Sequence, residues 1–111
     1  MTLNEFTTVT NIKTEITDSY GFTYRPVIIC NDGFLMSVQG SKGHYSQPRS
    51  VSDIFEEMEI GFLSQDEPLI FEYAETENDW TNTVYPYVPV EIIQQVIDKH
   101  NGINVEETFD K

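Results

Sequence analysis

The fold is decided by the stretch VIICNDGFLMSVQ, residues 27–39. Its Asn-Asp-Gly run at 31–33 separates two apolar segments, and these three residue types tolerate the positive φ angles that tight turns require. The sequence therefore predicts an antiparallel hairpin with strands at 27–30 and 34–39.

Further strands are predicted on both sides of this hairpin. Residues 6–17 are rich in threonine and isoleucine, which favours an extended strand. Apolar and acidic residues alternate over 57–62, which is typical of a strand with one solvent-facing side. The segment 68–74 is predicted to be a strand or a turn, and 83–85 an edge strand that ends before Pro86.

A C-terminal helix is predicted to begin at Pro89 and to end near Gly102. Proline suits the first helical position, and glycine suits the left-handed residue that follows a helix. The apolar residues and His100 fall within one arc of about 160°, so this helix should pack on the sheet. Residues 104–111 are expected to form a loose acidic tail, which Phe109 could dock.

Together these elements predict one α+β domain over residues 1–103. It has an antiparallel sheet of about four or five strands, with the C-terminal helix packed on one face. The single cysteine, Cys30, excludes an internal disulfide and is expected to be a buried, unreactive thiol. No apolar run approaches the roughly 18 residues that cross a bilayer, and no signal peptide is predicted.

Charge is distributed very unevenly along the chain. The net charge is −13, and between Arg49 and Lys99 there are twelve carboxylates with no lysine or arginine. A surface of one sign repels nucleic acid and attracts proteins whose basic grooves hold phosphate. Solubility is the competing explanation, although a surface that is only soluble usually mixes both signs.

Two acids of the 57–62 strand illustrate the binding hypothesis. Glu57 and Glu59 should project from one face about 6.6 Å apart, close to the phosphate spacing of a nucleic-acid strand. Neighbouring aromatic side chains would supply the anchors that interfaces need. The predicted partner-binding residues are Glu56, Glu57, Glu59, Glu72, Tyr73, Glu75, Glu77, Asp79 and Trp80.

A basic loop over residues 41–49 supports an alternative. Lys42, His44, Tyr45 and Arg49 could hold a phosphorylated or acidic ligand. The loop lacks the spacing of a P-loop. Its cations could equally be used to neutralise nearby carboxylates of the same chain.

Catalytic and metal chemistry find little support, so we predict no enzyme activity, no metal and no cofactor. The two histidines lie far apart in sequence, and the Glu75-x-Glu77-x-Asp79 run lacks the glycine and the final acid of a calcium loop. A small hydrolase would need His44 beside an activated nucleophile, such as a serine of the same loop.

Several short segments carry a resemblance to known proteins. They are NDGFLMSVQ (31–39), HY (44–45), PR (48–49), EIGF (59–62), VYPYVPV (84–90) and HNG (100–102). Together they resemble small uncharacterised proteins of bacteriophages and mobile elements, and the chain is similar in kind to anti-CRISPR proteins.

Together with the acidic surface, this likeness in kind leads us to expect a non-enzymatic phage inhibitor acting in the cytoplasm of a bacterial host cell. Its partner would be a basic nucleic-acid-binding protein such as a CRISPR effector, an RNA-guided nuclease. In the alternative reading, the chain is a small phage accessory module that uses the 41–49 loop. The resemblance transfers no site residue, and the acidic surface argues against direct binding to nucleic acid or to membranes.

Overall fold

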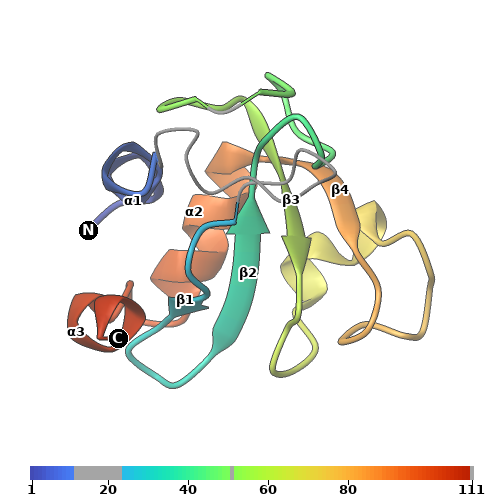
Figure 1. Ribbon diagram of the computed structural model, residues 1–111. Helices are drawn as coiled ribbons and strands as arrows, with labels where there is room; N and C mark the ends of the chain where they lie inside the picture. Colours follow the sequence, from blue (N-terminus) through green and yellow to red (C-terminus); the bar gives the residue numbers. More distant parts are fainter. Residues whose placement is uncertain (12–23, 51, 111) are drawn as a thin grey trace.

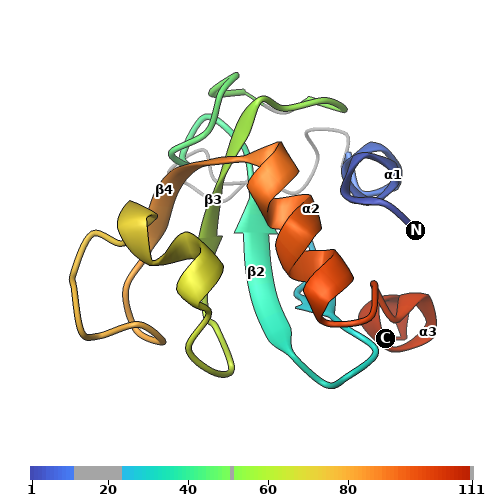
Figure 2. The same cartoon turned by 180° about the vertical axis from the view of Figure 1, so that it is seen from behind.

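In the computed structural model, four strands form one antiparallel sheet in the order β1-β2-β3-β4 (Figure 1). The structure describes residues 1–11, 24–50 and 52–110. The strands are β1 (Ile28–Ile29), β2 (Leu35–Gln39), β3 (Glu57–Gly61) and β4 (Tyr85–Pro89). Helix α2 (Val90–Lys99) lies across one side of the sheet (Figure 2). The predicted α+β class, with four strands and a helix near the C-terminus, is confirmed.

The predicted hairpin is present. Ile28 pairs with Met36 and Ile29 with Leu35, and the Cys30 N–H donates to the Phe34 carbonyl at 2.8 Å. Gly33 takes the positive φ of 95° that the turn requires. Cys30 is buried as predicted, and burial together with the nearby Asp32 raises the pKa of its thiol to about 11.

The core lies between the sheet and α2. Met58 and Ile60 on β3 are fully buried, whereas the alternate residues of that strand are partly exposed. Ile93, Val96 and Ile97 of α2 are buried against this apolar side. The predicted alternation is therefore confirmed over Glu57–Gly61, where one side of β3 is buried and the other is partly exposed. It is wrong for Phe62, which was expected on the apolar side but follows the end of the strand with a φ of 53° and is 80% exposed.

The prediction of a strand over 6–17 is wrong where the structure describes it. Helix α1 (Leu3–Val9) occupies this region, and residues 12–17 lie outside the described residues. Thr2 and Glu5 form a capping box, in which Thr2 Oγ1 accepts from Glu5 N at 3.1 Å and Glu5 Oε1 accepts from Thr2 N at 2.9 Å. This cap and the buried Phe6 outweigh the strand preference of the threonines.

The segment 68–74 forms a 3-10 helix, η1 (Pro68–Tyr73), rather than a strand. The edge strand β4 does not end before Pro86 but continues through it to Pro89, so that prediction is wrong. Met58 pairs with Val88 while Ile60 pairs with Tyr85, so β4 carries one extra residue opposite β3. Such a bulge on an edge strand accommodates a residue without an N–H.

The predicted C-terminal helix is confirmed with small shifts at its ends. It begins at Val90, and Pro89 is the residue before the helix rather than its first residue. Asn101, with φ of 69°, takes the left-handed position predicted for Gly102. Gly102 follows with φ of 86° and donates its N–H to the Ile97 carbonyl at 2.8 Å, which closes the helix end.

Instead of a loose tail, the last residues form helix α3 (Val105–Phe109), which lies near the end of α2 in Figure 2. The Asn104 side chain accepts from the Glu107 N–H at 3.0 Å and caps the helix. Thr108 Oγ1 accepts from Ile29 N at 3.0 Å and donates to the Ile29 carbonyl at 3.2 Å. These two hydrogen bonds hold α3 against the β1 edge of the sheet. None of the described helices is long and apolar enough to span a membrane.

Gly40, which directly follows β2, leaves no room for a side chain. A Cβ at this position would lie 2.3 Å from Phe55 Cε1, and the buried Phe55 ring is covered by the Arg25 guanidinium at 5.2 Å. We therefore expect Gly40→Ala to lower the free energy of unfolding by about 1–3 kcal/mol. Chemical denaturation measures this change. Gly61→Ala, whose Cβ would meet open space, is the control, and an equal loss in both variants would contradict the packing argument.

Candidate functional site

The side of the sheet turned away from α2, here called the outer side, is the side seen in Figure 1. Across β2 and β3, Ser37 pairs with Gly61 and Gln39 pairs with Glu59. Directly paired residues point to the same side of a sheet. These four residues therefore lie next to one another, and they form a polar centre on the outer side.

A cavity of about 200 Å³ lies over this polar centre. Its size suits one side chain or a small polar group. Two aromatic residues at its rim are strongly exposed, since Tyr24 is 54% and Phe62 80% accessible. The lining residues are Tyr24, Ser37, Gln39, His44, Glu59, Gly61, Phe62 and Val84.

Glu59 is the acidic residue of this cavity, and its carboxyl has an unusual environment. Burial raises its pKa above the ordinary value. The Tyr45 N–H, at 3.4 Å from Oε1, opposes the shift, while Glu75 adds to it and Arg49 opposes it weakly. Within the described part of the chain, no lysine, arginine or histidine forms an ion pair with Glu59.

The raised pKa has a consequence for stability. Because folded Glu59 holds its proton more tightly than the unfolded chain does, stability rises as pH falls through the folded-state pKa. At neutral pH the carboxylate is therefore unfavourable, and we expect Glu59→Gln to be at least as stable as the wild type there. Thermal unfolding over a pH series measures this, with Glu57→Gln as a control for net charge. A Glu59→Gln variant less stable than Glu57→Gln at neutral pH would contradict it.

Two aromatic residues of the outer side have unusual backbone conformations. Phe62 and Tyr87 take φ angles of 53° and 54°, a left-handed region that bulky residues rarely adopt. The Tyr87 N–H donates to the Tyr45 carbonyl at 3.1 Å, and the two rings lie 5.8 Å apart. Tyr87 lies in the β4 bulge, and bulges commonly redirect side chains beside functional sites. Strained residues of this kind cluster at such sites.

The structure brings together four of the predicted partner-binding acids. Glu75 lies close enough to raise the pKa of Glu59, and its N–H donates to the Val84 carbonyl at 3.0 Å. Burial raises the pKa of Tyr73, and Glu72 and Glu57 add to that shift. We call Glu57, Glu59, Glu72 and Glu75 the acidic region. Because η1 lies on the α2 side (Figure 2), this region bends around the β4 edge and is not one flat face.

The other predicted residues of this surface are placed differently. Glu56 is exposed directly before β3, and Glu77 and Asp79 are exposed in the loop that follows η1. Asp79 is used locally, because its Oδ1 accepts from Asn82 Nδ2 at 2.9 Å. Trp80 stacks on Phe71 with ring centroids 3.9 Å apart, so it supports this loop and is only half-exposed.

The basic loop over 41–49 divides into exposed and buried residues. Lys42, Tyr45 and Arg49 are exposed, and the Arg49 guanidinium lies 5.2 Å from the centre of the Tyr45 ring. His44 is buried at 3% exposure, with its ring edge-on to Tyr24. Neither Lys42 nor Arg49 forms an ion pair with a described carboxylate.

This loop also contains a serine–histidine pair. His44 Nδ1 lies 2.6 Å from Ser41 Oγ, and the same oxygen accepts from the Gly43 N–H at 3.1 Å. A hydrolytic nucleophile must be reachable by its substrate. Ser41 has no exposed surface, so in this arrangement the pair holds the loop together and does not present a nucleophile.

A third cluster, which sequence reasoning missed, surrounds His100. Its Nδ1 lies 2.6 Å from Asp32 Oδ2 and its Nε2 lies 2.8 Å from Glu67 Oε1. The ring stacks on Phe34 with centroids 4.0 Å apart, and Lys99 Nζ lies 2.9 Å from Glu67 Oε2. The cluster joins the hairpin turn, the start of η1 and the end of α2. No local motif predicts it, because its members are distant in sequence.

The charges of this cluster are well compensated. Burial alone would raise the pKa of Glu67, but hydrogen bonds from the Leu69 N–H, Lys99 and His100 outweigh it and lower the pKa. Hydrogen bonds from the Phe34 N–H and His100 lower the pKa of Asp32. Across residues 1–11, 24–50 and 52–110, no three acidic, histidine or cysteine side chains are placed to hold a metal ion. We therefore assign this cluster a structural role.

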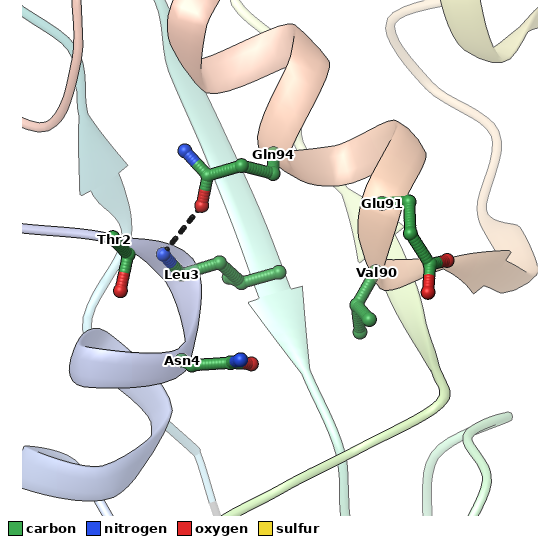
Figure 3. Close-up of a pocket in the computed structure, with 6 residues that line it drawn as sticks. All are labelled: Thr2, Leu3, Asn4, Val90, Glu91 and Gln94. Atoms are coloured by element: carbon green, nitrogen blue, oxygen red, sulfur yellow. Dashed lines mark hydrogen bonds between the residues drawn. The ribbon is translucent and has the colours of Figure 1, made fainter.

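A cavity of about 450 Å³ lies between the beginnings of α1 and α2 (Figure 3). The Leu3 N–H donates to Gln94 Oε1 at 2.8 Å, which ties the two helices together. Glu91 is the single charged residue among those lining it. The residues around this cavity therefore connect the two helices, but they include no group of reactive side chains.

Comparison of the chain with protein-family models, with characterised proteins and with solved structures found no match. Its residues and their arrangement are therefore the basis for assigning a function.

Proposed function

We propose that the protein is a non-enzymatic inhibitor that binds the basic nucleic-acid-binding surface of a partner protein through the acidic region. The observation that carries this proposal is the proximity of Glu59 on β3 and Glu75 in the loop after η1, where Glu75 adds to the raised pKa of Glu59. Like charges repel, so a fold that gathers them on one surface stores unfavourable electrostatic energy. A basic partner would relieve it.

The carboxylates of the acidic region form no ion pairs with the described cations of the chain. Within the described residues, the carboxylates that form ion pairs are Asp32 and Glu67, and both belong to the His100 cluster. The acids of the region are thus available to an external cation. Grooves that bind nucleic acid present rows of lysine and arginine. RNA-guided nucleases have such grooves and are the partner class that we propose.

Exposed aromatic side chains supply contact area beside these charges. Phe62, Tyr45 and Tyr87 are all exposed on or beside the outer side of the sheet. Aromatic residues dominate the energetics of many protein interfaces, whereas charges mainly set association rates and specificity. A surface with both features suits tight binding to a basic protein.

A second candidate is favoured by the exposed cations of the 41–49 loop. Because Lys42 and Arg49 are not consumed by ion pairs within the described chain, they could hold an acidic ligand. Lys42→Ala together with Arg49→Ala separates the two proposals. This double variant should lose an acidic ligand but should bind a basic partner at least as well as the wild type does.

The ionic strength of the buffer tests the main proposal. We expect the protein to bind an RNA-guided nuclease that carries no nucleic acid, with an affinity that falls steadily as salt rises, because salt screens exposed charges. Fluorescence anisotropy of the labelled protein, titrated with such nucleases, measures this. An affinity that does not change with salt would contradict binding through the acidic region.

A further inference from the structure

The cavity on the outer side of the sheet has one strong acceptor available to a ligand. Gln39 is engaged inside the protein, since its Nε2 donates to the Arg25 carbonyl and to Ser37 Oγ, both at 2.9 Å. Its Oε1 accepts from the Arg25 N–H at 2.7 Å. Among the residues that the structure describes, the long contact from the Tyr45 N–H is the one hydrogen bond of the Glu59 carboxylate. The group of the cavity that can bind a ligand is therefore the half-buried carboxylate of Glu59.

Within residues 24–50 and 52–110, the cations near Glu59 do not form an ion pair with it. Arg25 is buried, and its guanidinium donates to the Gly40 carbonyl at 2.8 Å, to Thr10 Oγ1 at 3.1 Å and to the Ser52 carbonyl at 2.9 Å. Arg49 lies against the Tyr45 ring and lowers the pKa of Glu59 only weakly. A cation from outside the chain would be the missing partner.

The rim of the cavity is suited to a cation as well. Phe62 keeps a strongly exposed ring on a left-handed backbone, an arrangement that is unfavourable both for the ring and for the main chain. The faces of aromatic rings attract cations within about 6 Å, and more strongly where water is excluded. An exposed ring beside a half-buried carboxylate is thus a combination that a cation would stabilise.

We propose that this cavity receives the guanidinium group of an arginine side chain, which would pair with Glu59 and stack on Phe62. This inference rests on the proposed function, because the arginine would belong to the basic partner. Arginine fits better than lysine for two reasons. Its planar head can form two parallel hydrogen bonds with a carboxylate, and it is weakly hydrated and stacks on aromatic rings.

Titration with N-acetyl-arginine amide, followed by NMR of the backbone amides, tests the proposal without any partner protein. We expect saturable shifts centred on Glu59, Gly61 and Phe62. The uncharged citrulline analogue should bind about tenfold more weakly or not at all, because it lacks the charge. Equal shifts with arginine and citrulline, or equal affinity for the lysine analogue, would overturn the assignment.

Three variants locate the site. Glu59→Gln should weaken arginine binding about tenfold, whereas Glu91→Gln, an exposed acid of α2 outside both the acidic region and the cavity lining, should leave it unchanged. Gly61→Val should block binding by filling the cavity, because a side chain there meets open space and valine suits a strand. If Glu59→Gln or Gly61→Val binds arginine like the wild type, the site is not this cavity.

Phe62→Gly separates a binding role from a structural one. Glycine adopts positive φ without strain, so this variant should fold at least as stably as the wild type. It should nevertheless bind arginine more weakly, because the ring is gone. Undiminished binding would overturn the stacking contact. If Glu59→Gln loses arginine binding but still binds the nuclease as well as the wild type does, the arginine does not come from the partner, and the proposed function stands. If the protein binds arginine but no nuclease, the arginine site stands and the proposed partner class is wrong.

Discussion

Glu67→Ala is expected to lower the free energy of unfolding by about 1–3 kcal/mol, the cost of leaving buried hydrogen-bonding groups without their partner. Glu67 is fully buried, and it pairs with His100 at 2.8 Å and with Lys99 at 2.9 Å. Its removal leaves the Nε2 atom of a buried imidazole without this partner and disconnects the start of η1 from the end of α2. Single domains are stable by only about 5–15 kcal/mol, so this loss is large.

Chemical denaturation of Glu67→Ala beside Asp66→Ala tests this expectation. Asp66 is the neighbouring acid and is exposed, so its removal matches the change in charge without touching the cluster. Glu67→Gln should fall between the two, because an amide keeps part of the hydrogen bonding. Equal stability of the Glu67→Ala and Asp66→Ala variants would show that the His100 cluster does not stabilise the fold.

The same cluster should respond to acid. Because the folded-state pKa values of Glu67 and Asp32 lie below their ordinary values of 4.5 and 3.8, their stabilising contribution is present above those values. It is lost as pH falls through the folded-state pKa values. We therefore expect a steeper loss of stability below about pH 4.5 in the wild type than in Glu67→Gln. Parallel pH profiles for the two proteins would contradict this linkage.

Neutralising the acidic region is expected to slow association with a basic partner about 10- to 100-fold at low salt, because long-range attraction mainly sets the association rate. The variant carries Glu→Gln at 57, 59, 72 and 75. Its control removes four charges elsewhere, at Glu91, Asp98, Glu106 and Asp110. These four residues are exposed in or next to α2 and α3. Both proteins thus have the same net charge.

Stopped-flow association with an RNA-guided nuclease compares the two variants. If only net charge matters, the association rates of both variants fall by the same factor. If the acidic region is the binding surface, its variant becomes much slower, while the control stays close to the wild type. Equal rates for the two variants would place the binding surface elsewhere.

Sequence patterns predicted those parts of the fold that depend on local chemistry. The Asn-Asp-Gly turn at 31–33 and the apolar arc of α2 are local signals, and both elements are present. The strand predicted over 6–17 failed because threonine content was given more weight than the capping box of Thr2 and Glu5. The course of β4 through Pro86 depends on a bulge opposite β3, which no local pattern shows.

The candidate site was predictable only in part. Alternation along the 57–62 strand correctly placed Glu57 and Glu59 on one side of the sheet. The approach of Glu75 to Glu59 depends on how the loop after η1 meets β4. The left-handed conformation of Phe62 and the meeting of Asp32, Glu67 and His100 are likewise products of tertiary structure. Single-sequence reasoning has no access to such contacts.

Competition with nucleic acid on a basic partner tests most directly whether the acidic region occupies a phosphate-binding groove. A guide-free RNA-guided nuclease is loaded with labelled guide RNA while the protein is titrated in, and the bound RNA is measured. If the acidic region occupies the phosphate-binding groove, the protein and the RNA exclude each other, and the four-residue variant loses this competition. A stable complex that contains the nuclease, the RNA and the protein together, with no change in RNA affinity, would contradict the proposal.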